Sequence, residues 1–364
     1  MLGRITITQL FAIFLLSTGL SNHVIVIPIL LNSSGRDAWI SVIIGYILIL
    51  AFSLLILRIT RQLQTVSLFE WITTNYSKVL SVIIAVLIAT FLVVTGWISL
   101  KETVMWTHQT YLLNTPVFFI AFFILGSSIY ISYGKLNIIA ICAGVLLPLV
   151  VLFGIFVAIG TIPDKDYHLI TPVLVENGWL DVLHGSLFAF GSAIEIFLLI
   201  MLQHQVTKKL KFRHLIFLVV FLSILTIGPL LGSIAIFGVE EAADIRYPAF
   251  FQWRILGIGN YFNHLDFLSI YQWTSGNFIR LAIILYLITQ AFSIKKKKTR
   301  LMIQLGICVL YILLIIAPIS DEQFLMFLSH YYYIYSSIFG VFIILFLALL
   351  ITMSKNKVSN HAQK

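Results

Sequence analysis

Ten long apolar stretches follow one another along this chain and leave little of it to form a water-exposed surface. Their approximate bounds are residues 5–31, 38–57, 79–106, 116–133, 137–160, 184–206, 214–238, 265–293, 301–319 and 328–353. A helix needs about 20 consecutive apolar residues to cross a bilayer. Of the 364 residues, 60% are hydrophobic and 10% are charged, whereas about a quarter of a soluble protein is charged. We therefore expect an all-α integral membrane protein with ten transmembrane helices, forming a single transmembrane domain over residues 1–364.

The positions of the basic residues predict the orientation of these helices. If the N-terminus is cytoplasmic, cytoplasmic segments hold 17 of the 23 Lys and Arg: Arg4, Arg58, Arg61, Lys78, Lys135, Lys208, Lys209, Lys211, Arg213, the lysines at 295–298, Arg300, Lys355, Lys357 and Lys364. Outside segments hold Arg36, Lys165, Arg246 and Arg254. Because Lys and Arg are enriched in cytoplasmic loops, we expect both termini in the cytoplasm, with residues 354–364 as a cytoplasmic tail. The net charge of +9 thus reflects topology in a lipid bilayer and does not indicate nucleic-acid binding.

Two of the apolar stretches are interrupted by small and polar residues. Residues 17–22 (STGLSN) interrupt the first stretch, and residues 189–193 (AFGSA) interrupt the sixth. An unwound backbone is costly in lipid, so such breaks persist only where they are buried in protein or line a cavity. Paired breaks in two halves of a chain are typical of a transporter-type binding site at the membrane midplane. The alternative is close helix packing, which small residues also allow.

The spacing of the breaks predicts an inverted repeat. The breaks lie in spans 1 and 6, an offset of five spans, and because five is odd the two halves of the chain have opposite orientations in the membrane. The first repeat covers about residues 1–160, and the second covers about residues 184–353. We therefore expect a 5+5 arrangement in which spans 1 and 6 are broken.

Helix ends at such breaks can hold a zwitterionic ligand. Exposed N–H groups carry the positive end of a helix dipole, and exposed carbonyls carry the negative end. A small amino acid offers a carboxylate and an ammonium to match them, while apolar and aromatic side chains line the rest of the site. The candidate ligand-binding residues are Thr18, Gly19, Leu20, Ser21, Asn22, His23, Trp97, Phe190, Gly191, Ser192, Ala193, Ile194 and Tyr286.

Charged residues inside the spans are expensive, and they are therefore paired or functional. Glu195 lies near the middle of span 6, and Arg280 lies near the middle of span 8. They form either a structural ion pair or a group that biases the ligand site or its gate. Lys101 and Glu102 lie toward the outer end of span 3. Lys101 either extends to the outer interface or contributes to an outer gate.

The chain resembles the B subunit of nutrient germinant receptors, within the spore germination permease-like family. The resemblance rests on the ten spans with short tails, Gly19 in the first span, and Arg246-Tyr247-Pro248 at the start of segment 246–254. It also rests on Trp273 and the run 276–280 (GNFIR) in span 8. That family is similar to the amino acid–polyamine–organocation transporters, so the resemblance implies a LeuT-like fold.

The same resemblance implies a function and partners. The protein would sense a small nutrient, commonly an amino acid, in the spore inner membrane. It would act with a membrane-bound A-type subunit and a C-type lipoprotein subunit. Arg280 would then stand where sodium-coupled relatives of the wider superfamily bind Na⁺, which predicts sodium-independent ligand action.

Two other functions remain open from the sequence. One is an amino-acid transporter of the same superfamily. The other is a membrane acyltransferase, in which His23 would act with Glu195 or Arg280. The sequence lacks the phosphate-binding GxxxxGK[ST] loop, the HExxH and CxxC motifs, and the Gly-x-Ser-x-Gly elbow. We therefore expect no catalytic residues, no cofactor and no metal.

Overall fold

The computed structural model of the chain describes residues 4–63, 65–257, 259 and 263–362. Apart from one isolated β-bridge, all regular structure in these residues is helical. The first half contains α1 (Ile7–Leu20), η1 (Ser21–Ile25), α2 (Ile27–Ser34), η2 (Gly35–Asp37), α3 (Ala38–Leu63), α4 (Leu68–Asn75), α5 (Lys78–Thr110), α6 (Val117–Ser132) and α7 (Leu136–Gly160).

The second half begins with two short 3₁₀ turns and then continues with long helices. Its elements are η3 (Ile162–Asp164), η4 (Tyr167–Ile170), α8 (Trp179–Ala193), η5 (Ile194–Leu198), α9 (Leu199–Leu202), η6 (Gln203–Gln205), α10 (Phe212–Phe237), α11 (Val239–Asp244), α12 (Pro248–Ile255), η7 (Leu265–Phe267), α13 (Leu268–Ala291), α14 (Lys297–Ile316), α15 (Asp321–Phe327), η8 (Leu328–Tyr332) and α16 (Tyr333–Ala362).

The membrane-protein class is confirmed by the helices. By length and composition, eight helical segments among the described residues can cross a membrane. The predicted spans at 116–133 and 265–293 are not among the eight. They fall on α6, which has only 16 residues, and on α13, whose 24 residues include Asn277 and Arg280. Asn277 and Arg280 are buried inside the protein, so α13 can be less apolar than a helix that faces lipid.

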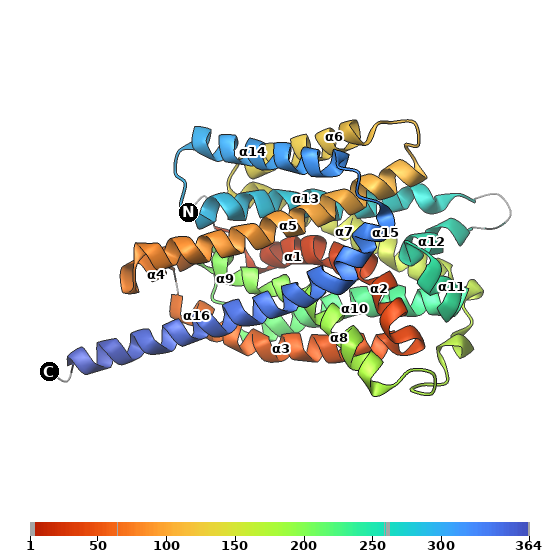
Figure 1. The fold of residues 1–364 in the computed structure, drawn as a ribbon, viewed down its shortest axis with the longest axis horizontal. Coiled ribbons are helices and arrows are strands. Elements are labelled where there is room, and N and C mark those ends of the chain that lie inside the picture. The colour runs from red at the N-terminus through yellow and green to blue at the C-terminus, as the bar shows by residue number, and fades with distance from the viewer. Residues whose placement is uncertain (1–3, 64, 258, 260–262, 363–364) are drawn as a thin grey trace.

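A turn at Gly35 separates α2 from α3. Gly35 has a φ of +50°, which an L side chain rarely adopts. A Cβ at this position would also come within 2.7 Å of Asn177 Nδ2. The chain reverses here, and α3 runs back along the molecule (Figure 1).

The long helices lie side by side along the longest axis of the molecule (Figure 1). One group consists of α3, α8 and α10, where α3 packs on both of the others. A second group consists of α5, α6, α13 and α14, where α13 packs on α5 and α6. The helix α1 packs on α13, α7 and α10, and it therefore lies between the two groups.

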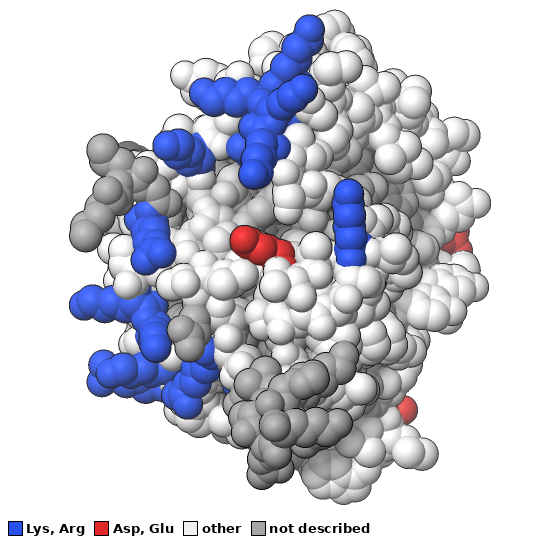
Figure 2. Space-filling view, turned by 90° about the vertical axis from the view of Figure 1, so that its left-hand side faces the viewer, with Lys and Arg blue, Asp and Glu red and all other residues white. Residues whose placement is uncertain are grey.

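The two ends of the molecule differ in charge. The N- and C-termini lie on the same side, at the left of Figure 1. Figure 2 shows that Lys and Arg gather along the top and the left of this face, whereas few acidic side chains are visible on it. This distribution agrees with the predicted concentration of basic residues on one side of the membrane.

Candidate functional site

At the first break the helical winding changes. We predicted an unwound backbone here, and that prediction was wrong. After α1 the chain continues as a π-helix, η1, and a bend at Val26 leads into α2. The side chains of Leu20 and Ser21 lie outside the described residues. Short π-helical segments inside longer helices are frequent at functional sites. The predicted irregularity in span 1 is present, but the helical hydrogen bonding is altered there and not lost.

The second break lies later in the sequence than predicted. The α-helix α8 continues through Phe190, Gly191, Ser192 and Ala193, and the winding tightens to a 3₁₀-helix only in η5, which starts at Ile194. Ser192 remains within the helix, where its hydroxyl donates to the carbonyl oxygen of Ala189 at 2.8 Å. The prediction of an unwound segment at 189–193 was therefore wrong.

Close packing explains the small residues in α8. A Cβ on Gly191 would overlap the carbonyl oxygen of Tyr333 in α16. The Gly191 carbonyl accepts a hydrogen bond from Ser336 Oγ at 2.9 Å. On the other side, Phe190 packs against Phe52 of α3 with ring centroids 5.6 Å apart. Gly191 thus lets α8 and α16 approach closely, which is the packing interpretation of this segment.

A buried ion pair joins the two changes of winding. Arg280 of α13 donates from Nη2 to Glu195 Oε1 in η5 at 2.5 Å, and from Nη1 to the Ser17 carbonyl of α1 at 2.6 Å. Both charged side chains are almost fully buried. One arginine thereby connects α1, η5 and α13. Removing one partner of such a pair costs about 3–5 kcal/mol, because the other charge is left buried and uncompensated.

The space beside this ion pair is very small. A cavity of about 10 Å³ is bordered by Ser17, Thr18, Glu195 and Arg280 together with apolar residues of α1 and α13. That volume holds about one water molecule. The buried Thr18 hydroxyl has no hydrogen-bond partner among the described residues. The region between the two breaks is therefore closed, and an amino acid would require the helices to move apart.

Asn22 connects the first break to two other helices. Asn22 Nδ2 donates to Tyr46 Oη of α3 at 2.7 Å, and Tyr46 Oη lies 2.9 Å from Thr226 Oγ1 of α10. Asn22 is fully buried, and its Oδ1 has no partner among the described residues. Tyr46 and Thr226 had no local signal in the sequence, because they lie far from Asn22 along the chain. The neighbouring His23 Nδ1 lies 2.5 Å from the Gly19 carbonyl oxygen.

Two predicted site residues lie away from the breaks. Trp97 packs edge-on against Phe324 of α15, with ring centroids 5.6 Å apart. Tyr286 donates from Oη to Gln205 Oε1 of η6 at 2.8 Å. The structure thus places Trp97 beside the short helix α15, and Tyr286 at the end of the broken helix that follows α8.

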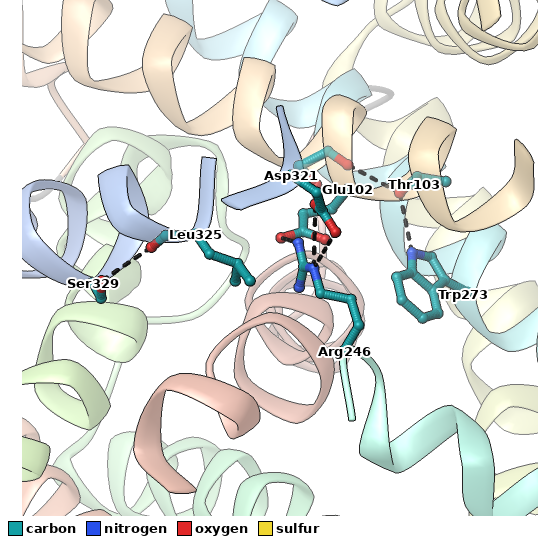
Figure 3. A network of polar contacts seen from close by, with 8 residues as sticks. Glu102, Thr103, Arg246, Trp273, Asp321, Leu325 and Ser329 are labelled. Carbon is teal, nitrogen blue, oxygen red and sulfur yellow. Dashed lines mark hydrogen bonds and ion pairs between the residues drawn. The ribbon is translucent and has the colours of Figure 1, made fainter. Parts of the chain in front are cut away.

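A charge network joins Arg246 to Glu102 and Asp321 (Figure 3). We call it the outer latch, because its three residues belong to the side that the sequence predicts to be outside. Arg246 Nη2 lies 2.8 Å from Glu102 Oε1, and Nε lies 3.2 Å from Asp321 Oδ2. Glu102 is fully buried, whereas the Asp321 side chain is 32% exposed. Burial acts to lower the pKa of Arg246, but the two carboxylates outweigh it and raise that pKa above its ordinary value. The latch holds α5, the segment before α12 and α15 together.

Lys101 lies beside this latch and does not reach water. It is buried, and its Nζ donates to the Ile319 carbonyl at 3.1 Å and lies 5.2 Å from the ring centroid of Phe324. The alternative in which Lys101 extends to the outer interface was therefore wrong. The role of Arg246 could not be predicted from the sequence, because the partners of this arginine lie far from it along the chain.

The opposite end is closed by a short backbone pairing. Ile5 N donates to the Gln205 carbonyl at 2.9 Å, and Thr207 N donates to the Ile5 carbonyl at 2.9 Å. This is the isolated bridge between Ile5 and Val206. Together with the Tyr286–Gln205 hydrogen bond, it joins the start of α1 to the end of the broken helix. We call this the inner closure, because Ile5 and Gln205 lie next to segments that the sequence predicts to be cytoplasmic.

Comparison with known proteins identifies the family. A family model described as "Spore germination protein" matches residues 4–325. The chain belongs to the spore germination protein family. It is 36% identical over 350 residues to "Spore germination protein XB" of Bacillus anthracis, which covers 96% of this chain and 98% of that protein. It is also 22% identical over 288 residues to "Putative spore germination protein YfkT" of Bacillus subtilis (strain 168), covering 79% of this chain and 78% of that protein. The resemblance found in the sequence is thus confirmed, and this member of the family is a germination-related membrane protein.

Proposed function

We propose that this protein is the germinant-sensing membrane subunit of a spore germination receptor, and that its ligand is a small amino acid. The observation that carries the proposal is the buried Arg280–Glu195 pair, which lies where the winding changes of two broken helices meet. Charged groups are costly at such depth, and the ones that occur there are therefore paired or functional. Membership of the spore germination protein family supports the physiological setting.

The chemistry of this pair suits a zwitterion. The carboxylate of an amino acid would interact with the Arg280 guanidinium, and the ammonium would interact with Glu195 and the Ser17 carbonyl. The carboxylate of the ligand would take the place of Glu195 beside Arg280, and the ammonium would take the place of Arg280 beside Glu195. The ligand and the ion pair then compete, so binding is coupled to separation of α1, η5 and α13.

Both ends of the molecule offer a way to couple the ligand to a signal. The outer latch holds α15 over the outer side, and the inner closure holds the start of α1 against Gln205. Opening of one end while the other stays closed is the alternating-access behaviour of inverted-repeat proteins. We propose that the germinant shifts the balance between these states. The change would be passed to an A-type membrane subunit and a C-type lipoprotein subunit.

We further propose the ten-helix, LeuT-like 5+5 arrangement, with repeats at about 1–160 and 184–353. The packing of α3 with α8 and α10, and of α13 with α5 and α6, supports two helix groups that can move relative to each other. The basic face that carries both termini supports a cytoplasmic location for them, in the spore inner membrane (Figure 2).

An amino-acid transporter is the second candidate, because closures at both ends of one central site also suit the passage of a ligand. Uptake of labelled amino acids by the purified protein in liposomes distinguishes the two. A sensor gives binding without net uptake, whereas a transporter gives uptake in the absence of other subunits. The acyltransferase alternative gains no support, since the contact of His23 is with the Gly19 carbonyl and not with Glu195 or Arg280.

The deciding experiment deletes the gene and tests the spores against a panel of amino acids, sugars and nucleosides. We expect loss of the response to at least one amino acid, with restoration by the wild-type gene. Spores that lack the gene and still respond normally to every germinant in the panel would overturn the proposed function.

A further inference from the structure

A large groove lies between α7 and α10, with α1 and α13 as its floor. Its volume is about 1270 Å³. The walls are mostly apolar and include Val151 and Ile155 of α7, and Phe217 and Ile224 of α10. This groove is separate from the small cavity beside Arg280, and it is by far the larger of the two.

The groove spans most of the thickness of a membrane hydrocarbon region. Its lining follows α10 from Arg213 to Pro229. At 1.5 Å per residue this distance is about 24 Å, which compares with a hydrocarbon core of about 30 Å. Gly228 adds to the open space, because a Cβ there would have no atom within 4 Å. The groove can therefore hold an extended acyl chain.

One mouth of the groove is strongly basic. Lys208, Lys209, Lys211 and Arg213 all line it and are exposed. Within the part of the chain that the structure describes, none of the four forms a salt bridge. Lys208, Lys209 and Lys211 lie on the loop just before α10, and Arg213 lies in the first turn of α10. Basic residues clustered at a membrane surface attract the phosphates of anionic lipids.

Hydroxyl groups lie at the same mouth. Thr6, Thr8 and Thr207 line the groove there, beside the four basic residues. Hydroxyls and lysine ammoniums are both donors to phosphate oxygens. This combination of an apolar slot with an anion-binding mouth matches the two parts of a phospholipid.

We propose that the groove between α7 and α10 binds an anionic phospholipid, with its phosphate at Lys208–Arg213 and an acyl chain along Phe217 and Ile224. A transmembrane helix of another protein is less suited, because it would have to bring acidic residues to the same mouth. The proposal does not depend on the proposed germinant-sensing function.

The position of the lipid gives it influence over the first break. His23 lines the groove, and Leu225 of its wall lies beside Gly19, where a Cβ would be 3.3 Å from Leu225 Cδ1. A bound acyl chain therefore contacts residues around η1. The lipid occupant would thus support the π-helical segment through His23 and Leu225.

The test compares dioleoyl phosphatidylglycerol with dioleoyl phosphatidylcholine on the purified full-length protein, using native mass spectrometry to measure retained lipid. The variant replaces Lys208, Lys209 and Lys211 with Gln. The matched control replaces Lys295, Lys296 and Lys297 with Gln, because these exposed lysines carry equal charge but do not line the groove. We expect the wild type and the control to retain phosphatidylglycerol at least tenfold more tightly than phosphatidylcholine. The groove variant should lose this preference.

A second variant tests the apolar part. Gly228→Phe fills the open space without changing charge, and it should reduce retention of both lipids. An equal loss of the preference for phosphatidylglycerol in the groove variant and in the control variant would overturn the proposal. It would indicate that any basic surface of the protein attracts this lipid. Unchanged retention in Gly228→Phe would also overturn it. A photo-crosslinker at Phe221 in the native membrane must form lipid adducts, and adducts exclusively with a protein would assign the groove to a partner helix.

Discussion

The Arg280 guanidinium lies 2.5 Å from the Glu195 carboxylate and 2.6 Å from the Ser17 carbonyl, all in the core of the membrane domain. This one arginine fixes the relative positions of α1 and η5. The pair closes the space between the two broken helices, which leaves a cavity of about 10 Å³. We propose that a ligand with two opposite charges separates it.

Arg280→Gln should destabilise the protein by about 3–5 kcal/mol, because Glu195 is then buried without its partner. The double variant Glu195→Gln/Arg280→Gln should be more stable than the sum of the two single effects predicts, since it leaves no unpaired charge. Thermal unfolding of the purified variants in detergent measures the cycle. Strictly additive effects would show that the two side chains do not interact in the folded protein.

Gly191→Ala should weaken the packing of α8 on α16 by about 1–3 kcal/mol, because the added Cβ would overlap the Tyr333 carbonyl. Gly126→Ala is the matched control, since a Cβ at Gly126 meets no atom within 4 Å. Thermal unfolding of both variants checks the prediction. Equal stability of the two alanine variants would mean that α8 and α16 are not in close contact at Gly191.

The outer latch should resist opening toward the outer side. Asp321→Asn removes a partly exposed pair worth about 1 kcal/mol, which corresponds to about a fivefold increase in the open population. Glu102→Gln should have the larger effect, because Glu102 is fully buried beside Arg246. A cysteine at Thr18, in a protein without Cys142 and Cys308, reports opening through its rate of labelling by an impermeant reagent. Labelling that is equally slow in all variants would contradict the latch.

Tyr286→Phe should loosen the inner closure by about 0.5–1.5 kcal/mol, because Gln205 loses one hydrogen bond. The same Thr18 cysteine should then label faster from the side that carries the two termini, and no faster from the other side. Tyr271→Phe serves as the control, since its hydroxyl contacts Leu146 of α7. An equal effect of both phenylalanine substitutions would show that Tyr286 has no special part in the closure.

The apolar pattern predicted the membrane class and the positions of the helices, because span length and hydropathy are local properties of the sequence. The sequence could not show whether Glu195 and Arg280 contact each other. In the structure they form a direct ion pair. The predicted position of the second break was wrong. Gly191 and Ser192 lie within an intact helix, where Gly191 allows close packing on α16. Glycine and serine produce the same local signal in a break and in a tight helix contact.

The parts that the sequence could not predict are long-range. The Asn22–Tyr46–Thr226 chain joins three helices, and the outer latch joins residues more than 70 positions apart. Neither has a spacing that a single sequence reveals. Such contacts depend on how the helices pack, and packing is decided by the whole set of buried surfaces.

The most direct test of the central claim is an equilibrium titration of the purified protein with the amino acid that the deletion spores no longer recognise. The wild type should bind it, and Arg280→Gln should reduce the affinity at least tenfold. Arg254→Gln, which changes an exposed arginine far from the buried pair in the sequence, should bind as the wild type does. Equal affinity in the wild type and in a folded Arg280→Gln protein would contradict a ligand site at the Arg280–Glu195 pair.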